Sequence, residues 1–189
     1  MATTKRTARV AIRNNQPQPI LAVGVKHKYS SVYQHEGEWG IVKPGELTDK
    51  TLTVEYNTGL FTTGVDWWGV SWYSEDMKTL YYSNPQNFRG VIENIEKITT
   101  PVLVTAGWVA SDLANAGATR HSLAHVATIV AGSTTAVLFN SEDTVGLKRH
   151  MLVEEDEDEL TEIIINEDNT ITFKSRSGIS ETVTATKSM

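Results

Sequence analysis

Hydrophobic and polar residues alternate with a period of two along much of the first hundred residues. This pattern is typical of β-strands with one buried face. It predicts strands over residues 8–14, 20–27, 51–56, 60–63, 66–73 and 77–83. Two of these strands carry their apolar positions in full alternation: Val10 and Ile12 in the first, and Leu21, Val23, Val25 and His27 in the second.

Turn residues separate these strands and continue into the last third of the chain. The run from Asn14 to Pro17 is rich in turn formers, so we expect the first two strands to pair as a hairpin. Strands are also predicted over residues 147–153, 160–165, 170–174 and 181–186. Residues 166–169, Asn-Glu-Asp-Asn, have the length and composition of a four-residue hairpin loop.

The segment 66–73 is the most aromatic strand, and its inner and outer faces differ. Trp68, Val70 and Trp72 share one face, which we expect in the core because aromatic rings bury a large apolar area.

The opposite face of that strand carries Trp67 and Tyr73 with two small residues, Gly69 and Ser71, between them. At a rise of about 3.3 Å per residue, the two rings lie roughly 20 Å apart and bracket a shallow trough. Either the trough is open and presents exposed aromatic rings, or a second layer covers it.

Residues 98–141 differ in kind, because only Asp112 and Arg120 carry a full charge there. Apolar residues at helical spacing predict two helical pieces, at 109–116 and 123–130, while residues 134–139 fit a helix or a strand equally well. The segment is either a buried, partly helical insertion or one that enters a membrane after a conformational change. The predicted architecture is a single mainly β domain over residues 1–189, an antiparallel β-sandwich with a short helical insertion around residues 98–135.

Composition narrows the class of function. The chain has no cysteine, which excludes disulfides and thiol chemistry. Its net charge of −6 argues against nucleic-acid binding. Residues 154–159 form an acidic run that we expect to be a solvated loop, with a calcium site as the alternative. The basic start lacks a following apolar stretch, so we expect a cytoplasmic protein.

Catalytic motifs are missing, and we expect neither an enzyme nor a cofactor. No phosphate-binding loop occurs, and the sequence around Ser71 lacks the second glycine of a nucleophile elbow. His121 and His125 have a spacing that can hold a metal on a helix, but the more common role is hydrogen bonding at a helix edge. Asp66 lies beside two tryptophans, where it is either a turn cap or a carboxyl group with a raised pKa.

Aromatic side chains offer the clearest binding chemistry. The chain has five tryptophans and six tyrosines, most of them between residues 29 and 82. Exposed rings of this kind stack on sugars or lie at a lipid headgroup boundary. The candidate ligand-binding residues are Trp67, Tyr73, Trp39, Tyr81 and Tyr82.

Three strings, at residues 54–59, 62–72 and 81–90, resemble a family found in fungi and nematodes. They read VEYNTG, TTGVDWWGVSW and YYSNPQNFRG, and the likeness extends to TITFKS at residues 170–175. The family is named for proteins up-regulated in long-lived insulin-receptor mutants of the nematode. The resemblance implies a β-sandwich that forms a homo- or hetero-dimer, distantly similar to the aegerolysin- and actinoporin-like sandwiches that bind membrane lipids. It brings no catalytic residues.

Three functions follow as hypotheses. The first is recognition of a membrane lipid or headgroup through exposed aromatics. The second is sugar binding by the same aromatic trough, as in a lectin. The third is a structural or interaction role as a dimer without a small ligand.

Overall fold

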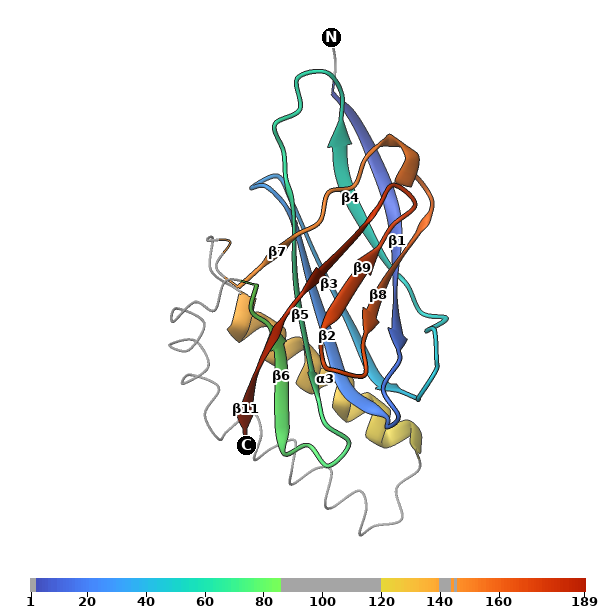
Figure 1. Cartoon of the computed structure of the whole chain (residues 1–189), viewed down its shortest axis with the longest axis vertical. Helices are drawn as coiled ribbons and strands as arrows, with labels where there is room; N and C mark the ends of the chain where they lie inside the picture. Colours follow the sequence, from blue (N-terminus) through green and yellow to red (C-terminus); the bar gives the residue numbers. More distant parts are fainter. Residues whose placement is uncertain (1–2, 86–119, 140–143, 145) are drawn as a thin grey trace.

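The computed structural model describes residues 3–85, 120–139, 144 and 146–189, which form two stacked β-sheets with a helix on the outer face of one (Figure 1). The first sheet has the order β10 (Ile179–Thr182), β9 (Ile171–Lys174), β8 (Leu160–Ile165), β1 (Thr4–Asn14) and β4 (Leu52–Thr58). The second has the order β11 (Thr184–Ser188), β6 (Thr79–Ser83), β5 (Asp66–Tyr73), β2 (Ile20–Tyr29) and β3 (Tyr33–Val42), with β7 (Lys148–Arg149) paired to β5. The mainly β sandwich predicted from the sequence is therefore confirmed.

The pairing of β1 corrects two expectations. It does not form a hairpin with β2, because the two strands belong to different sheets. At the crossing between sheets, the buried Asn14 amide donates to the backbone oxygens of Gln18 at 2.9 Å and Val42 at 3.0 Å. β1 also runs parallel to β8, so the first sheet is mixed rather than wholly antiparallel.

The space between the sheets is filled by the alternating apolar positions. Trp68, Val70 and Trp72 of β5 are buried there, as are Val10 and Ile12 of β1, so the faces predicted for these strands are confirmed. A strand that keeps its period of two delivers every second side chain to the same layer.

A bulge changes the face of one predicted residue in β2. The pairing with β5 shifts between Leu21 and Gly24, and Ala22 has a positive φ of 50°. Val23 and Val25 therefore point between the sheets as expected, whereas Leu21 packs against the cluster on the helix side. An extra residue at a bulge reverses the alternation beyond it.

Helix α3 (Arg120–Phe139) packs on β3, β2 and β5. Small residues let its backbone approach: a Cβ added at Gly40 would lie 2.2 Å from the backbone oxygen of Ala124. The helical piece predicted at 123–130 is confirmed, and 134–139 continues it as helix. The predicted piece at 109–116 and the rest of the segment 98–119 lie outside the described residues.

Other local expectations have mixed outcomes. The hairpin loop between β8 and β9 is confirmed, and Asn169 there has a φ of 65°, which asparagine tolerates. Residues 60–63 form a turn, not a strand, and only Lys148–Arg149 of the strand predicted over 147–153 pairs. The acidic run contains the short 3-10 helix η1 (Glu154–Asp156); it is largely exposed, except that Asp156 is fully buried.

Candidate functional site

The trough expected between Trp67 and Tyr73 is not open. Tyr73 is fully buried beneath α3, and its hydroxyl lies 2.8 Å from that of Thr134 on the helix. A Cβ added at Gly69, in the middle of the trough, would lie 2.8 Å from both Phe139 and Leu147. The alternative, that a second layer covers this face, is confirmed.

The remaining aromatic candidates do not present open rings either. Trp39 and Tyr82 are buried, each with 4% of its surface exposed. The indole of Trp39 donates to the backbone oxygen of Lys50 at 3.0 Å. Tyr81 is half-buried and stacks on Trp72 with ring centroids 5.2 Å apart. Trp67 is also half-buried, against the cluster below the helix.

Three large exposed apolar side chains lie on two loops, which we call the apolar end, whereas others such as Ile129 and Ile179 lie elsewhere on the described surface. Leu60 and Phe61 lie on the β4–β5 loop with 84% and 77% of their surface exposed, and Val32 lies on the β2–β3 turn with 59% exposed. The β4–β5 loop reaches the end of the sandwich where the chain begins (Figure 1). The sequence signal was two adjacent apolar residues within a turn bounded by glycines, which the strand prediction over 60–63 obscured.

Hydrogen bonds tie these two loops into one unit. The backbone N–H of Ser30 donates to the oxygen of Val65 at 2.9 Å, and the N–H of Val65 donates to the Ser30 hydroxyl at 3.1 Å. Gly64 lies flat on Tyr29, since an added Cβ would lie 2.0 Å from its ring. The Tyr29 hydroxyl donates to the oxygen of Asn57 at 3.0 Å. The two loops of the apolar end are therefore held together.

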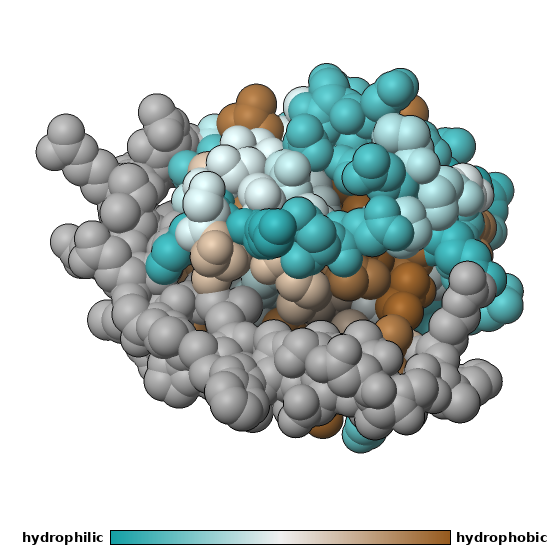
Figure 2. All heavy atoms as spheres, turned by 90° about the horizontal axis from the view of Figure 1, so that it is seen from below, coloured by the Kyte–Doolittle hydropathy of each residue, from teal (hydrophilic) through white to brown (hydrophobic). Residues whose placement is uncertain are grey.

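The two loops of the apolar end carry no charged residues of their own, although Lys5 of β1 lies over the Tyr33 ring. Residues 29–34 and 57–65 contain no Asp, Glu, Lys or Arg. Seen from the opposite end of the molecule, the described surface is largely hydrophilic, with hydrophobic residues mainly in a band across the middle of the view (Figure 2). Exposed apolar patches mark interaction sites on many proteins.

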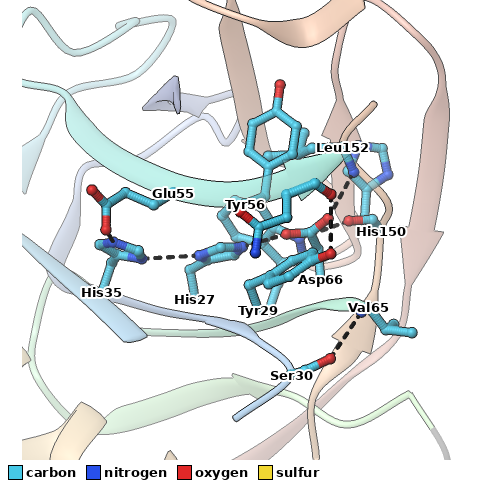
Figure 3. Close-up of polar contacts among 12 residues, drawn as sticks. His27, Tyr29, Ser30, His35, Glu55, Tyr56, Val65, Asp66, His150 and Leu152 are labelled. Atoms are coloured by element: carbon cyan, nitrogen blue, oxygen red, sulfur yellow. Dashed lines mark hydrogen bonds and ion pairs between the residues drawn. The ribbon is translucent and has the colours of Figure 1, made fainter. Parts of the chain in front are cut away.

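A chain of ionisable side chains runs between the sheets below the apolar end (Figure 3). His27 and Asp66 are both fully buried, and Nε2 of His27 lies 2.8 Å from Oδ1 of Asp66. On its other side, Nδ1 of His27 lies 3.2 Å from Nδ1 of His35, whose Nε2 is 3.6 Å from Glu55. The second carboxylate oxygen of Asp66 accepts the N–H of Leu152 at 3.0 Å.

This arrangement corrects the expectation that Asp66 caps a turn. The carboxylate caps no local turn; it anchors β5 to β2 and to the segment after β7. Burial and the nearby His27 lower the pKa of His35, although Glu55 opposes that shift. The sequence signal for His27 was its place on the apolar face of a predicted strand.

A second buried histidine has serine neighbours. Nδ1 of His150 lies 2.8 Å from the Ser180 hydroxyl, and Nε2 lies 3.2 Å from that of Ser175. Its ring stacks on Phe173 at 5.8 Å, and burial lowers its pKa. Both ring nitrogens face hydroxyls, so no carboxylate orients this ring as in a hydrolytic triad. The group pins the β9–β10 hairpin to the core.

The described residues offer neither a metal site nor a membrane-spanning helix. Within residues 3–85, 120–139, 144 and 146–189, no group of three or more His, Asp or Glu side chains could hold a metal ion. His125 is exposed on α3, and the side chain of His121 lies outside the description. Among the helices of the described residues, none has the length and apolarity to cross a bilayer.

One protein-family model matches the chain over residues 4–184. The family carries the description "Up-Regulated in long-lived daf-2". The match spans both sheets and the apolar end. No curated protein matches the chain.

Proposed function

Since the chain belongs to the family up-regulated in long-lived daf-2, we propose that this β-sandwich is a non-catalytic binding protein that docks on lipid bilayers through its apolar end. The observation that carries the proposal is the exposure of Leu60, Phe61 and Val32 on two linked loops without charges. The exposed aromatic of the lipid hypothesis is thus Phe61, not Trp67 or Tyr73.

The chemistry of the apolar end favours lipid over sugar. Sugar sites stack a ring on an aromatic face and bond its hydroxyls with nearby polar groups. Leucine and valine supply neither, but both partition into hydrocarbon. The covered trough on β5 also removes the platform on which the sugar hypothesis depended.

The non-catalytic part of the proposal is supported by how the reactive groups are distributed. The buried Asp66–His27 pair has His35, not a nucleophile, on the other ring nitrogen. The histidine that does contact serines, His150, lacks a carboxylate partner on its ring. A hydrolytic relay needs all three groups in one line.

The apolar surface of these few side chains is small enough that docking on a bilayer is reversible. Burying a leucine or phenylalanine side chain is favourable by about 1.5–3 kcal/mol. Leu60 and Phe61 together therefore contribute on the order of 4 kcal/mol, and tenfold in affinity corresponds to about 1.4 kcal/mol. Replacing both with serine is expected to weaken vesicle binding by roughly a hundredfold or more.

Vesicle co-sedimentation tests the proposal, with lipid mixtures that contain or lack sphingolipid and sterol. The double variant Leu60→Ser/Phe61→Ser is compared with Val183→Ser, which removes an apolar side chain of 56% exposure outside the two loops. We expect wild type and Val183→Ser to pellet with vesicles and the double variant to remain in the supernatant. Equal pelleting of all three proteins, or none with any mixture, contradicts the proposal.

Light scattering separates the alternative occupant, a second copy of the chain. If the apolar end is a dimer interface, wild type is a dimer without lipid and Leu60→Ser/Phe61→Ser is a monomer. Soluble glycans added to the vesicle assay address the sugar hypothesis, because a glycan that releases the protein competes for the same surface. In the light-scattering test, a molar mass that is the same for wild type and the double variant argues against a dimer at this surface and supports lipid docking.

A further inference from the structure

The contact between His27 and His35 lies near the turn of the β2–β3 hairpin, and that turn carries Val32. The two histidines are cross-strand partners, with Nδ1 atoms 3.2 Å apart and ring centroids 5.4 Å apart. Beyond them, Tyr29 pairs with Tyr33 and the chain turns. A change in the His27–His35 contact therefore acts on the end of the β2–β3 hairpin, whose turn forms one of the two loops of the apolar end.

A hydrogen bond between two ring nitrogens holds a single proton. One nitrogen donates and the other accepts, so the pair fits the contact when at least one Nδ1 carries no proton. When both rings are doubly protonated, two N–H groups face each other and two positive charges lie within the same small space. The observed contact is thus incompatible with full protonation of both histidines.

The partners of the two rings determine which ring can move to relieve this conflict. Asp66 on β5 accepts from Nε2 of His27, and Trp68 packs 4.3 Å from its ring centroid. His35 alone is near a surface group, Glu55 on β4, which Lys5 on β1 contacts at 2.5 Å. The ring free to move is therefore His35, away from His27 and toward Glu55.

The other titratable groups around the pair do not compensate for a second charge. They are Tyr29 on β2, Tyr33 on β3, Tyr56 on β4 and, after β7, His150 and Asp156. The tyrosines are neutral in acid, and burial lowers the pKa of His150. Asp156 is engaged by Val153 and Ser177.

We propose that His27 and His35 form an acid-sensitive latch that keeps the two loops of the apolar end joined at neutral pH, the closed form, and lets the β2–β3 hairpin open when both rings are protonated. Movement of His35 loosens the adjacent Tyr29–Tyr33 pair at the end of the hairpin. The hydrogen bonds between Ser30 and Val65, which hold the β4–β5 loop, weaken as a result. More apolar surface is then available for lipid. This consequence rests on the proposed docking function, whereas the latch itself does not.

The direction with pH follows from proton linkage. The lowered pKa of His35 means that the closed form binds the second proton more weakly than the open form does. The closed form is therefore favoured at pH values above the ordinary pKa of histidine. Its population falls as the pH drops below that value. Each pH unit shifts the opening equilibrium by up to about tenfold per proton taken up.

Hydrogen exchange tests the latch without lipid. Protection factors are compared at pH 7.5 and 5.0 for the Ser30 amide, with the Asn166 amide of the β8–β9 loop as internal control. We expect Ser30 protection to fall by roughly tenfold or more in acid, with Asn166 unchanged. His35→Gln is expected to abolish this dependence, and the matched variant His125→Gln, exposed on α3, to retain it. Equal protection at both pH values, or the same fall in His35→Gln, overturns the latch.

Ring NMR of the wild type provides a test that needs no variant. We expect His35 to remain singly protonated at pH values where an ordinary histidine is fully charged, and the loss of Ser30 protection to follow its titration. Full protonation of both rings with Ser30 still protected overturns the latch.

Binding to phosphatidylcholine vesicles then separates the latch from docking, since a bilayer without net charge limits simple electrostatic attraction. We expect wild type and His125→Gln to bind more tightly at pH 5.0 than at pH 7.5, and His35→Gln to bind equally at both. Acid-dependent exchange without any vesicle binding supports the latch and contradicts docking. Vesicle binding with acid-independent exchange supports docking and overturns the latch.

Discussion

The inner and outer faces of the second sheet pack against different partners, with side chains of different size. The inner face meets the first sheet through large rings such as Trp68 and Trp72, and it also holds the buried pair His27–Asp66. On the outer face, glycines such as Gly40 let the backbone of α3 approach closely, beside the buried ring of Tyr73. Removing volume is therefore costly on the inner face, and adding volume is costly on the outer face.

This difference also explains why the aromatic strand β5 is not a binding surface. Its rings alternate between two closed layers, one made by a sheet and one by a helix. The loops that carry Val32, Leu60 and Phe61 lie beyond both layers, and their apolar side chains stay accessible. The proposed docking surface is thus a consequence of where the layers end.

The largest expected effect comes from neighbouring tryptophans on opposite faces. Trp68→Ala opens a cavity beside His27 and Phe173 and removes the indole bond to the His150 oxygen. It should lower the free energy of unfolding by about 3–5 kcal/mol. Trp67→Ala, at a half-buried ring, should cost about 1–2 kcal/mol. Denaturant unfolding measures both; equal losses would mean that the two faces are packed alike.

A matched pair of glycine substitutions sharpens the contrast on the helix side. Gly40→Ala forces a methyl group to within 2.2 Å of the backbone of Ala124 and should destabilise the protein by about 1–3 kcal/mol. Gly132→Ala lies within α3 with its nearest neighbour, Glu38, at 3.5 Å. It should stabilise by about 0.5–1 kcal/mol, because alanine favours a helix. Thermal unfolding measures both effects as changes in Tm. A Tm shift of the same sign for the two variants would contradict the close approach of α3 to β3.

The smallest expected effect is a pH dependence from the inner face. Burial lowers the pKa of His150, so the unfolded chain takes up this proton before the folded protein does. Stability from the neutral ring is present above the ordinary histidine pKa and is lost as the pH falls through that range. Unfolding free energies at several pH values should fall more steeply in acid for wild type than for His150→Gln. A steeper fall in the variant would mean that the ring is charged when folded.

The sequence predicted those features that depend on neighbours along the chain. Alternation placed Val10, Trp68 and Trp72 on buried faces, because a strand has a fixed period. Turn chemistry located the loop before Asn169. Helical spacing found the part of α3 around residues 123–130.

The sequence pattern did not predict strand β3, for a reason that is also local. Its outward positions carry polar residues such as Gln34 and Glu36, and glycines interrupt the pattern. Strand β3 forms because it pairs with β2 along its whole length, although the sequence of β3 shows no clear strand pattern. The hairpin expected for β1 and β2 failed because the turn after Asn14 leads to the other sheet, a choice that depends on Val42, 28 residues away.

By itself, the sequence determined the class of fold, the buried faces of several strands and the family resemblance, because these follow from periodicity and from short strings of residues. Only the tertiary structure decided which aromatic rings are covered, since that depends on a helix more than forty residues beyond β5. It also brought His27, His35, Glu55 and Asp66 together from four strands. Side chains on separate strands meet only after non-local pairing has fixed the register, and a linear pattern does not specify that pairing.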